Sequence, residues 1–242
     1  MTRLALVTGA SGGIGSAIAR RLASDGLSVI VGFNSNAEAA EGLVAQLPGT
    51  GHMSMQLSVL DSAGIAEAVS EIASLDVLVN CAGVTQPVPH DNLDDLTDEL
   101  IDRIFQTNWR GPFAMVRALR QALEVAPDPV VVNISSIAGV TGQGSNVAYC
   151  ASKAALDSMT RSLGRALAPK IRVMSVSPGW VLGEYAARMP PEMLQVQADA
   201  TPMGRLATGD DVAAAVSAVV HDLRFTTGSI ITVDGGRPLG TS

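Results

Sequence analysis

Short apolar runs alternate with longer amphipathic stretches along the whole 242-residue chain. Each run is continuously apolar, the pattern of parallel strands that are covered on both faces. The predicted strands are Leu4–Thr8, Ser28–Phe33, Met53–Val59, Val77–Asn80, Val130–Ser135, Arg172–Ser177 and Ile230–Val233. The predicted helices are Ile14–Ala23, Ala37–Leu47, Ile65–Ile72, Trp109–Leu123, Ala154–Leu167 and Val212–His221. Strand-then-helix repetition predicts right-handed βαβ units and a doubly wound α/β fold, with one parallel sheet of about seven strands between two layers of helices.

The pattern predicts a single domain over residues 1–242. No linker, repeat or low-complexity tract interrupts it, and α/β folds often reach this length as one unit. One long irregular stretch, rich in Pro and Met, covers residues 183–203, and such a stretch inside a compact domain predicts a substrate lid. The large apolar side chains in and beside it either line a substrate pocket or pack the lid itself; they are Trp180, Tyr185, Met189, Met193 and Met203.

Charge and composition exclude several classes of protein. With 47% hydrophobic and 16% charged residues, the chain is too apolar to be disordered. A formal net charge of -7 leaves no basic surface for a nucleic acid, and no apolar run has the roughly 18–20 residues of a membrane-spanning helix. Two cysteines and three scattered histidines follow no ligand spacing, so no metal site is predicted. These features predict a cytoplasmic protein without nucleic-acid, membrane or metal partners.

A glycine-rich turn, Thr8-Gly9-Ala10-Ser11-Gly12-Gly13-Ile14-Gly15, follows the first predicted strand. Glycines let the backbone turn sharply and approach a pyrophosphate, which the N–H groups and dipole of the following helix can hold. No Lys-Ser/Thr pair follows the last glycine, so the turn is not a Walker A loop. A tight turn without a ligand is the alternative, but the position after the first strand of a βαβ unit favours a dinucleotide site.

A tyrosine and a lysine lie four residues apart in Tyr149-Cys150-Ala151-Ser152-Lys153, in a chain with two of each. That spacing puts both side chains on one face of a helix. A phenol has a pKa of about 10, and a nearby ammonium lowers it by favouring the phenolate. Taken alone, an ordinary contact on an amphipathic helix explains the pair better. However, Ser136 and Asn80-Cys81-Ala82-Gly83 add polar groups after two predicted strands, at the edge where ligands bind in open α/β sheets.

Six motifs together resemble those of the short-chain dehydrogenase/reductase family. They are TGASGGIG at residues 8–15, NCAG at 80–83, NISS at 133–136, YCASK at 149–153, PG at 178–179 and VDGG at 233–236. Their order and spacing match the family over nearly the whole chain. The most similar branch is the compact one that contains the 3-oxoacyl-(acyl-carrier-protein) reductases. The resemblance implies a Rossmann-type fold and a nicotinamide-dependent oxidoreductase.

The resemblance also implies roles for individual residues. Tyr149 would be the general acid/base, and Lys153 would bind the nicotinamide ribose and lower the pKa of the tyrosine. Ser136 would hydrogen-bond the substrate carbonyl or hydroxyl, and Asn108 would hold a water in a proton relay to the lysine. The implied cofactor contacts besides Tyr149 and Lys153 are Gly9, Ser11, Gly13, Ile14, Gly15, Asn34, Ser35, Asn80, Ala82, Gly83 and Val181.

The chain departs from the family pattern at a few positions. Cys81 stands where a second Asn is usual, Ser58 where an Asp often contacts the adenine, and Gly183 where a Thr helps to hold the nicotinamide amide. Carrier-protein reductases present basic residues near the start of the fifth strand, but here Glu124 and Asp128 precede it. Acidic residues would repel an acidic carrier protein, although a solvated acidic face explains them equally well.

The end of the second strand predicts the choice of cofactor. Enzymes for NAD(H) usually place an acidic residue there for the ribose 2′-hydroxyl, but none occurs before Glu38. The run Asn34-Ser35-Asn36 offers neutral donors to a 2′-phosphate and Ser11 can add a hydroxyl, whereas Gly12 supplies no positive charge. The sequence therefore predicts NADP(H) as the preferred cofactor, with NAD(H) also used.

The sequence thus predicts an enzyme that interconverts a ketone and a secondary alcohol, with 3-oxoacyl compounds among the candidate substrates. A non-catalytic dinucleotide-binding regulator or redox sensor is the alternative, and four filled catalytic positions argue against it. By resemblance we expect a homo-oligomer, specifically a tetramer. The helix Trp109–Leu123 supports this expectation with more apolar residues than one face against a sheet requires. They are Phe113, Met115, Val116, Leu119 and Leu123.

Overall fold

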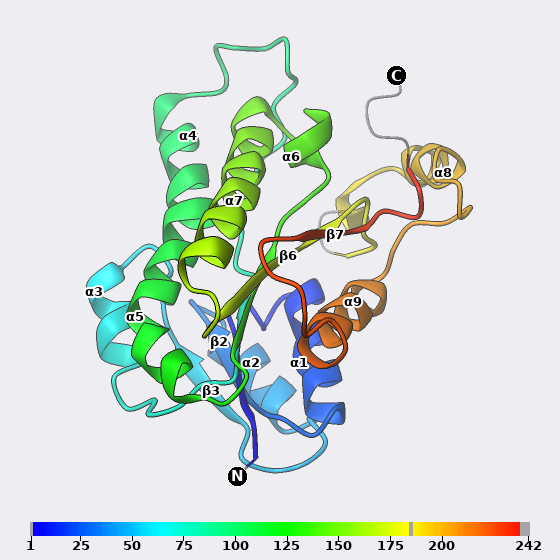
Figure 1. Cartoon of the computed structure of the whole chain (residues 1–242). Helices are drawn as coiled ribbons and strands as arrows, with labels where there is room; N and C mark the ends of the chain where they lie inside the picture. The colour runs from blue at the N-terminus through cyan, green and yellow to red at the C-terminus, as the bar shows by residue number, and fades with distance from the viewer. Residues whose placement is uncertain (1, 184–185, 238–242) are drawn as a thin grey trace.

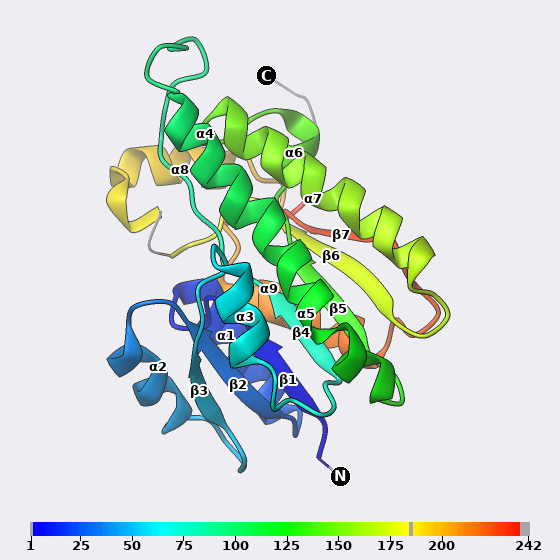
Figure 2. The same ribbon diagram turned by 90° about the vertical axis from the view of Figure 1, so that its left-hand side faces the viewer.

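The structure, a computed structural model, describes residues 2–183 and 186–237. In this part of the chain, seven parallel strands form one sheet in the order β3-β2-β1-β4-β5-β6-β7. Figure 2 shows the sheet from β3 on one side to β7 on the other. The strand order reverses between β1 and β4, and ligands of doubly wound folds bind at such a switch point. The predicted Rossmann-type α/β sheet is confirmed.

The strands are short, and the five central ones are almost entirely buried, whereas the edge strands β3 and β7 contain no buried residue. They are β1 (Leu4–Val7), β2 (Ser28–Phe33), β3 (Met53–Gln56), β4 (Val77–Asn80), β5 (Val130–Ile134), β6 (Arg172–Pro178) and β7 (Ile230–Val233). Asn80 of β4 is in register with Asn133 of β5, which is in register with Ser175 of β6. A polar row therefore crosses three neighbouring strands, of which β4 and β5 are otherwise entirely apolar.

Helices cover both faces of the sheet, as Figures 1 and 2 show. One layer consists of α1 (Gly13–Ser24), α2 (Ala37–Val44) and α9 (Gly209–His221). The other consists of α3 (Ser62–Ala68), α5 (Gly111–Val125) and α7 (Val147–Ala166). The helix α4 (Asp98–Phe105) runs into α5 through a π-helical turn, η1 (Gln106–Arg110).

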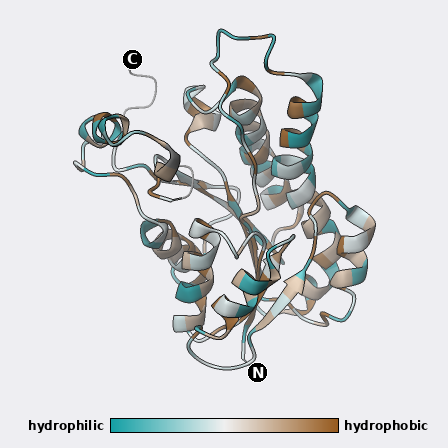
Figure 3. Cartoon of the chain, turned by 180° about the vertical axis from the view of Figure 1, so that it is seen from behind, coloured by the Kyte–Doolittle hydropathy of each residue, from teal (hydrophilic) through white to brown (hydrophobic). Residues whose placement is uncertain are grey.

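Alternate residues of each central strand enter two separate cores. In β1, Ala5 and Val7 face the core under α1 and α9, whereas Leu6 faces the core under α3 and α5. This alternation is the ordinary two-residue period of a strand. Figure 3 shows the resulting pattern, with apolar colour along the central strands and polar patches on the outer helices. Within the described residues, no helix is long and apolar enough to cross a membrane.

The structure corrects several predicted boundaries. The third strand ends at Gln56, not Val59, because its pairing with β2 ends where Gln56 lies opposite Phe33. The predicted helix Trp109–Leu123 begins at Gly111, because the residues before it form the wider π-helical turn. The predicted helix Ala154–Leu167 begins at Val147, directly after a capping asparagine.

Three helices are absent from the sequence prediction: α4, α6 (Ala138–Thr141) and α8 (Pro191–Asp199). The stretch 183–203, predicted to be irregular, contains α8 and a 3₁₀ turn, η2 (Ala186–Arg188). No residue of α8 is buried, so the helix has no apolar face of the kind that reveals a helix in a sequence. Tyr185 lies outside the described residues, and the lid role of the stretch stays a prediction.

Candidate active site

The glycine-rich turn joins β1 to α1 at the carboxyl edge of the sheet. Gly9 has a φ of +64°, a conformation that residues with a Cβ rarely adopt. A Cβ added at Gly15 would lie 2.4 Å from the carbonyl oxygen of Gly9, so the folded chain itself requires these two glycines. Gly13 is different, because it is exposed and an added Cβ would contact nothing within 4 Å. Its backbone therefore stays open to a ligand.

The helix α1 begins without the side-chain acceptor that several other helices have. Its N-cap is Gly12, and no acidic residue lies in its first turn. By contrast, Asn36 caps α2, Thr97 caps α4 and Asn146 caps α7. The first N–H groups of α1 carry partial positive charge with no side-chain oxygen to satisfy them. Such a helix end suits a phosphate group.

Thr8 connects the glycine-rich turn to the loop after β4, a role that the sequence analysis missed. Its buried Oγ1 accepts hydrogen bonds from the backbone N–H groups of Cys81 (3.0 Å) and Ala82 (3.1 Å). A Cβ added at Gly9 would also lie 2.9 Å from the Cα of Ala82. The two loops predicted to hold the dinucleotide are therefore in contact. The available signal was a hydroxyl residue at the start of the motif.

Asn80 directs its side chain into the interior. Its Nδ2 donates to Oδ1 of Asn133 (2.9 Å), and Nδ2 of Asn133 donates to Oγ1 of Thr160 on α7 (2.9 Å). The Thr160 hydroxyl also hydrogen-bonds to the hydroxyl of Ser175 (2.8 Å). The polar row thus holds α7 against β4, β5 and β6, and the contact of Asn80 with a cofactor stays a prediction.

Lys153 is buried at the carboxyl end of β5. Its Nζ donates to the carbonyl oxygen of Ile134 (2.8 Å) and lies 5.7 Å from the centroid of the Tyr149 ring. A Cβ added at Gly83 would lie 3.8 Å from the same Nζ. The structure therefore brings the predicted Tyr–Lys pair, the loop after β4 and the end of β5 to one point.

Ser136 lies two residues beyond the end of β5, not in the strand itself. Its Oγ accepts a hydrogen bond from the backbone N–H of Ala138 (3.2 Å), at the start of α6. The helix α6 packs directly on α7, because a Cβ added at Gly139 would lie 2.7 Å from the backbone nitrogen of Ala154. The predicted substrate-binding serine thus lies just before the short helix that packs on the Tyr–Lys helix.

Asn108 lies in the π-helical turn and is almost fully buried. Its Oδ1 accepts from the N–H of Val84 (2.9 Å), and its Nδ2 donates to the carbonyl oxygen of Val84 (3.0 Å) and to Oγ of Ser152 (3.1 Å). π-Helical turns occur frequently at functional sites. These contacts place Asn108 beside the residue that precedes Lys153, and its role in holding a water stays a prediction.

The residues predicted to choose the cofactor lie at the end of β2. The side chains of Asn34 and Ser35 are exposed, and no other described residue engages them. The third predicted donor, Asn36, uses its Oδ1 to accept from the N–H of Ala39 and so to cap α2. Two neutral side chains therefore remain available to a ligand at this strand end.

Val181 pairs with Ala207 in an isolated bridge. In this bridge, the N–H of Leu182 donates to the carbonyl oxygen of Ala207, and the N–H of Ala207 donates to the carbonyl oxygen of Trp180. These hydrogen bonds leave the N–H and C=O of Val181 itself unused among the described residues. Backbone groups of this kind are suited to the carboxamide of a nicotinamide.

Burial changes the pKa of three groups at the carboxyl end of β5. It lowers the pKa of Lys153 to about 8, an effect that Cys81 and Asp157 partly oppose. It raises the pKa of the Cys81 thiol to about 12, so this thiol is neutral at pH 7. It also raises the pKa of Asp157, one helical turn beyond Lys153. Of these groups, the lysine titrates near physiological pH.

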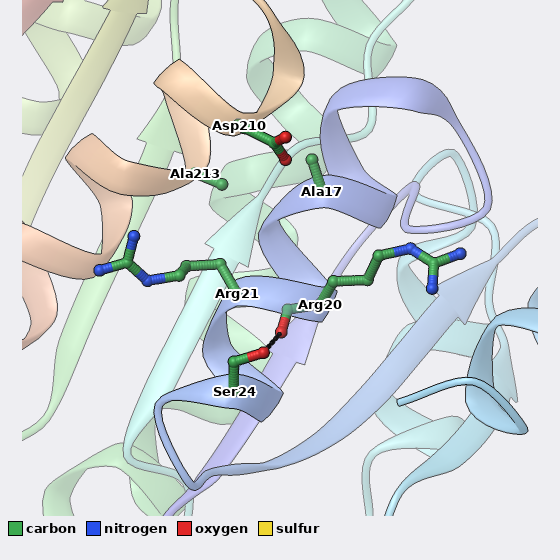
Figure 4. A pocket seen from close by; sticks show the side chains of 6 residues that line it. All are labelled: Ala17, Arg20, Arg21, Ser24, Asp210 and Ala213. Atoms are coloured by element: carbon green, nitrogen blue, oxygen red, sulfur yellow. Dashed lines mark hydrogen bonds between the residues drawn. The ribbon is translucent and has the colours of Figure 1, made fainter. Parts of the chain in front are cut away.

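A shallow hollow of about 230 Å³ between α1 and α9 involves none of the predicted site residues (Figure 4). Arg20 and Arg21 line it, and Figure 4 shows their guanidinium groups pointing away from each other. Arg20 donates to Oε1 of Gln46 (2.7 Å), and Arg21 pairs with Asp25 (3.0 Å). The hollow offers no convergent charge, and no cluster in the described part of the chain is suited to a metal ion.

The helix α5 does not carry the excess apolar surface predicted from the sequence. Met115, Val116, Leu119 and Leu123 are all buried in the core that α5 shares with the sheet and α3. Of the five predicted positions, only Phe113 is exposed, and its ring stacks on that of Trp109 with centroids 6.0 Å apart. The prediction that these residues form an exposed apolar surface for an oligomer is therefore wrong at four of the five positions. The reason is that α3 packs on the side of α5 that was predicted to be exposed.

Comparison with known proteins gives matches along nearly the whole chain. A family model described as Enoyl-(Acyl carrier protein) reductase matches residues 9–237. The 3-oxoacyl-(acyl-carrier-protein) reductase FabG of Staphylococcus aureus is 34% identical over 98% of this chain and 98% of its own. A cis-4-hydroxycyclohexanecarboxylate dehydrogenase of Sinomonas cyclohexanicum is also 34% identical, over 97% of this chain and 96% of its own.

A solved structure of a short-chain dehydrogenase/reductase of the glucose/ribitol dehydrogenase type, from Brucella melitensis, matches with a TM-score of 0.91. It is 28% identical and covers 98% of this chain and 97% of its own. The names of these relatives refer to different substrates, so the similarity identifies the family and not the substrate. The chain belongs to the NAD(P)-dependent short-chain dehydrogenase/reductase family.

Proposed function

We propose that the protein interconverts a ketone and a secondary alcohol by hydride transfer with a nicotinamide dinucleotide. The observation that carries this proposal is the buried Lys153, whose Nζ is held by the carbonyl oxygen of Ile134 beside the ring of Tyr149. An ammonium in that place favours the phenolate and so makes the phenol a usable acid/base near neutral pH. A purely structural helix would not require a buried cation next to its tyrosine.

The residues around this pair fit a nicotinamide dinucleotide, which supplies the hydride when bound. The uncapped N-terminus of α1 and the open backbone at Gly13 suit its pyrophosphate. Gly83 lies close to the Nζ of Lys153, and the unused backbone groups of Val181 suit the carboxamide. Asn34 and Ser35 would meet the adenosine ribose at the end of β2.

The chain's own groups handle the proton and the developing charge. In the reductive direction, the phenol of Tyr149 donates its proton to the substrate oxygen, and the phenolate that remains is stabilised by the ammonium of Lys153. Ser136 donates a hydrogen bond to the same oxygen while charge develops on it, where a placed donor contributes most. Holding the carbonyl carbon in position for the hydride accounts for much of the remaining acceleration.

A panel of ketones, with 3-oxoacyl thioesters among them, tests the reaction class. Consumption of the reduced nicotinamide is followed by absorbance, with Tyr149→Phe as the matched control. We expect turnover with at least one carbonyl compound and none above background in the variant. If the dinucleotide bound tightly and no compound were turned over, a non-catalytic regulator would be the better description.

We propose NADP(H) as the preferred cofactor, with measurable use of NAD(H). The support is the exposed and unengaged pair Asn34 and Ser35, together with the absence of an acidic side chain between the start of β2 and Glu38. Hydrogen bonds to a charged phosphate contribute about 1.5–3 kcal/mol each, which is enough for a preference. Comparing kcat/KM for NADPH and NADH on one substrate tests this proposal, and a clear advantage for NADH would contradict it.

The substrate panel includes both free and carrier-bound 3-oxoacyl thioesters. Arginines of the chain pair with the two acidic residues that were predicted to repel an acidic carrier protein. Glu124 pairs with Arg120 (2.8 Å), and Asp128 lies 3.6 Å from Arg172. They also precede β5, whereas Ser136 follows it, so the two groups lie at opposite ends of that strand. They therefore give little reason to exclude a carrier-bound substrate.

We also propose a homotetramer, on the family resemblance alone. The stacked and exposed rings of Trp109 in η1 and Phe113 in α5 form an apolar surface that is available for an interface. Light scattering at micromolar concentration tests the proposal, and a particle of 24.9 kDa would contradict it.

A further inference from the structure

The backbone of Tyr149 is held from both sides by buried side chains. Its N–H donates to Oδ1 of Asn146 (2.7 Å), and its carbonyl oxygen accepts from Oγ of Ser152 (2.8 Å). The Ser152 hydroxyl accepts in turn from Nδ2 of Asn108 (3.1 Å). Since a serine has one hydroxyl proton, which Ser152 gives to Tyr149, the direction of these bonds is unambiguous.

Both of these paths end on the same short segment, residues 84–86. Nδ2 of Asn146 donates to the carbonyl oxygen of Gln86 (2.7 Å). Asn108 engages both backbone groups of Val84, at 2.9 and 3.0 Å. Together with the chain from Val84 to Gln86, the hydrogen bonds close a ring, whose members in order are Tyr149, Asn146, Gln86, Val84, Asn108 and Ser152.

Asn146 joins the two sides of this ring and has no exposed surface. It is the N-cap of α7, with an extended backbone (φ -167°, ψ 170°), and Tyr149 is the third helical residue after it. An asparagine amide can accept from the helix and donate to a neighbouring segment at the same time. A serine, the usual alternative at an N-cap, supplies the acceptor for the helix but is too short to keep the second bond.

The chain just before Asn146 is also packed against the tyrosine and joined to the same loop. A Cβ added at Gly144 would lie 3.2 Å from Cδ1 of Tyr149. The N–H of Val88 donates to the carbonyl oxygen of Ser145 (2.8 Å), and Nε2 of His90 lies 3.1 Å from the carbonyl oxygen of Gly144. Residues 84–90 and 144–149 therefore behave as one connected unit, with Asn146 at its centre.

We propose that Asn146 is a positioning residue of the reaction, which fixes Tyr149 relative to the segment 84–86 through the hydrogen bonds of its amide to Tyr149, Gln86 and Thr85. The inference rests on the proposed function, because it assigns to Tyr149 the proton transfer described above. Asn146 acts through the tyrosine and has no contact with the substrate. The segment 84–86 directly follows the loop 80–83, so the ring also couples the phenol to a loop predicted to line the dinucleotide. If the phenol of Tyr149 is displaced slightly, it is no longer aligned with the substrate oxygen, and kcat falls.

Two variants and a matched control separate positioning from helix stability. Asn146→Ala removes the bonds to Tyr149, Gln86 and Thr85, whereas Asn146→Ser keeps an acceptor for the N–H of Tyr149 and loses the bonds to Gln86 and Thr85. Thr208→Ala is the control, because it removes the N-cap of another helix, α9, by deleting the acceptor for the N–H of Asp211. All three are compared with the wild type well below their thermal midpoints, in kcat, KM and dinucleotide Kd.

We expect Asn146→Ala to lower kcat by about 10- to 100-fold while KM and the dinucleotide Kd stay within about twofold. Its thermal midpoint should fall about as far as that of Thr208→Ala, whose kcat stays at the wild-type value. Asn146→Ser should recover the thermal midpoint and only part of kcat, because the bond to Gln86 is still missing.

Two results would overturn the inference while leaving the proposed function intact. One is an Asn146→Ala enzyme that keeps the kcat of the Thr208→Ala control. The other is full recovery of kcat in Asn146→Ser, which would reduce Asn146 to a helix cap. A wild-type protein without turnover on any carbonyl compound would instead overturn the proposed function, and the inference with it.

Discussion

The two ends of the sheet carry polar groups of different kinds. At the amino end, charged groups pair with each other: Arg3 lies 3.7 Å from Asp76, and Arg172 lies 3.6 Å from Asp128. At the carboxyl end, the buried Lys153 has a carbonyl oxygen as its hydrogen-bond acceptor, and no carboxylate of the described residues lies within ion-pair distance of it. The same strands therefore end in pairs of opposite charges on one side and in a single buried ammonium on the other.

This difference separates stability from chemistry within one sheet. The contacts of Asp76 illustrate the structural role of the amino end. Its Oδ2 accepts a hydrogen bond from the N–H of Leu4 (2.9 Å), and its backbone links β1 to β5. A change there should weaken the fold and leave the reaction alone. At the carboxyl end, the uncapped α1 and the isolated Lys153 cost stability but leave donors and charge available to a ligand. Changes at that end should mainly affect turnover.

The largest effect is expected for Tyr149→Phe. Loss of the phenolic proton should lower kcat by about 10²- to 10⁴-fold, the usual contribution of a general acid. The dinucleotide Kd and the free energy of unfolding should stay close to the wild-type values, because the change removes one oxygen at the functional end. Stopped-flow turnover, fluorescence titration and urea unfolding measure the three quantities. Wild-type turnover on a confirmed substrate would remove Tyr149 from the mechanism.

The titration of Lys153 should affect activity and stability in opposite directions. Its pKa is lowered to about 8 from 10.5 by burial, so the ammonium is lost above about pH 8 and kcat/KM for reduction should fall roughly tenfold per pH unit there. In the unfolded chain the lysine keeps its proton up to about pH 10.5, so the unfolded state binds more protons in this window. The contribution of Lys153 to stability therefore rises from about pH 8 to about pH 10.5.

Lys153→Met provides the control for both halves of that prediction. The variant should lose turnover and also bind the dinucleotide more weakly, because the family resemblance predicts that the ammonium contacts the nicotinamide ribose as well as the phenol. Its unfolding free energy should lack the rise with pH that the wild type shows. A wild-type stability curve with the same alkaline slope as the variant would contradict the lowered pKa.

Asp76→Ala should lower the free energy of unfolding by about 1–3 kcal/mol, because the N–H of Leu4 and the guanidinium of Arg3 lose a buried acceptor. The kcat of the folded enzyme should not change. Urea unfolding and turnover at the same temperature measure both. A loss of kcat with unchanged stability would show that the two ends of the sheet are coupled.

The smallest effect is expected for Thr208→Ala. Thr208 caps the N-terminus of α9 with its side chain, whereas the N-terminus of α1 has no side-chain cap. Thr208 and Asp211 form a reciprocal capping box, and Asp211 also pairs with Arg205 (2.6 Å). Removing the hydroxyl should cost about 1 kcal/mol of unfolding free energy, with no change in kcat. Gly12→Ser places a side-chain acceptor at the start of α1. We expect this variant to gain unfolding free energy and to bind the dinucleotide more weakly. A loss of unfolding free energy as large as that of Thr208→Ala would contradict the distinction between the two helix ends.

The features that could be predicted from the sequence are those with a local signature. The glycine-rich turn and the pair Tyr149 and Lys153 depend on spacings of a few residues, and the strand-and-helix alternation extends over the chain. The contacts of Asn108 and Asn146 join residues 24 and 60 positions apart, and no local pattern reports such pairs. The burial of α5 was missed for a related reason, because the helix α3 that covers it is distant in the sequence.

The buried row of Asn80, Asn133 and Ser175 has a consequence for how the sheet assembles. The neighbouring strands β4 and β5 are otherwise runs of valine, leucine and isoleucine, in which a shifted alignment would pack nearly as well as the correct one. A shift of one residue turns every side chain to the opposite face, so it would leave the amide of Asn133 without its partners among aliphatic groups. Each unpaired buried polar group costs about 1–3 kcal/mol. The three polar residues therefore specify the register of β4, β5 and β6, because a misaligned pairing of these strands is less stable than the correct one.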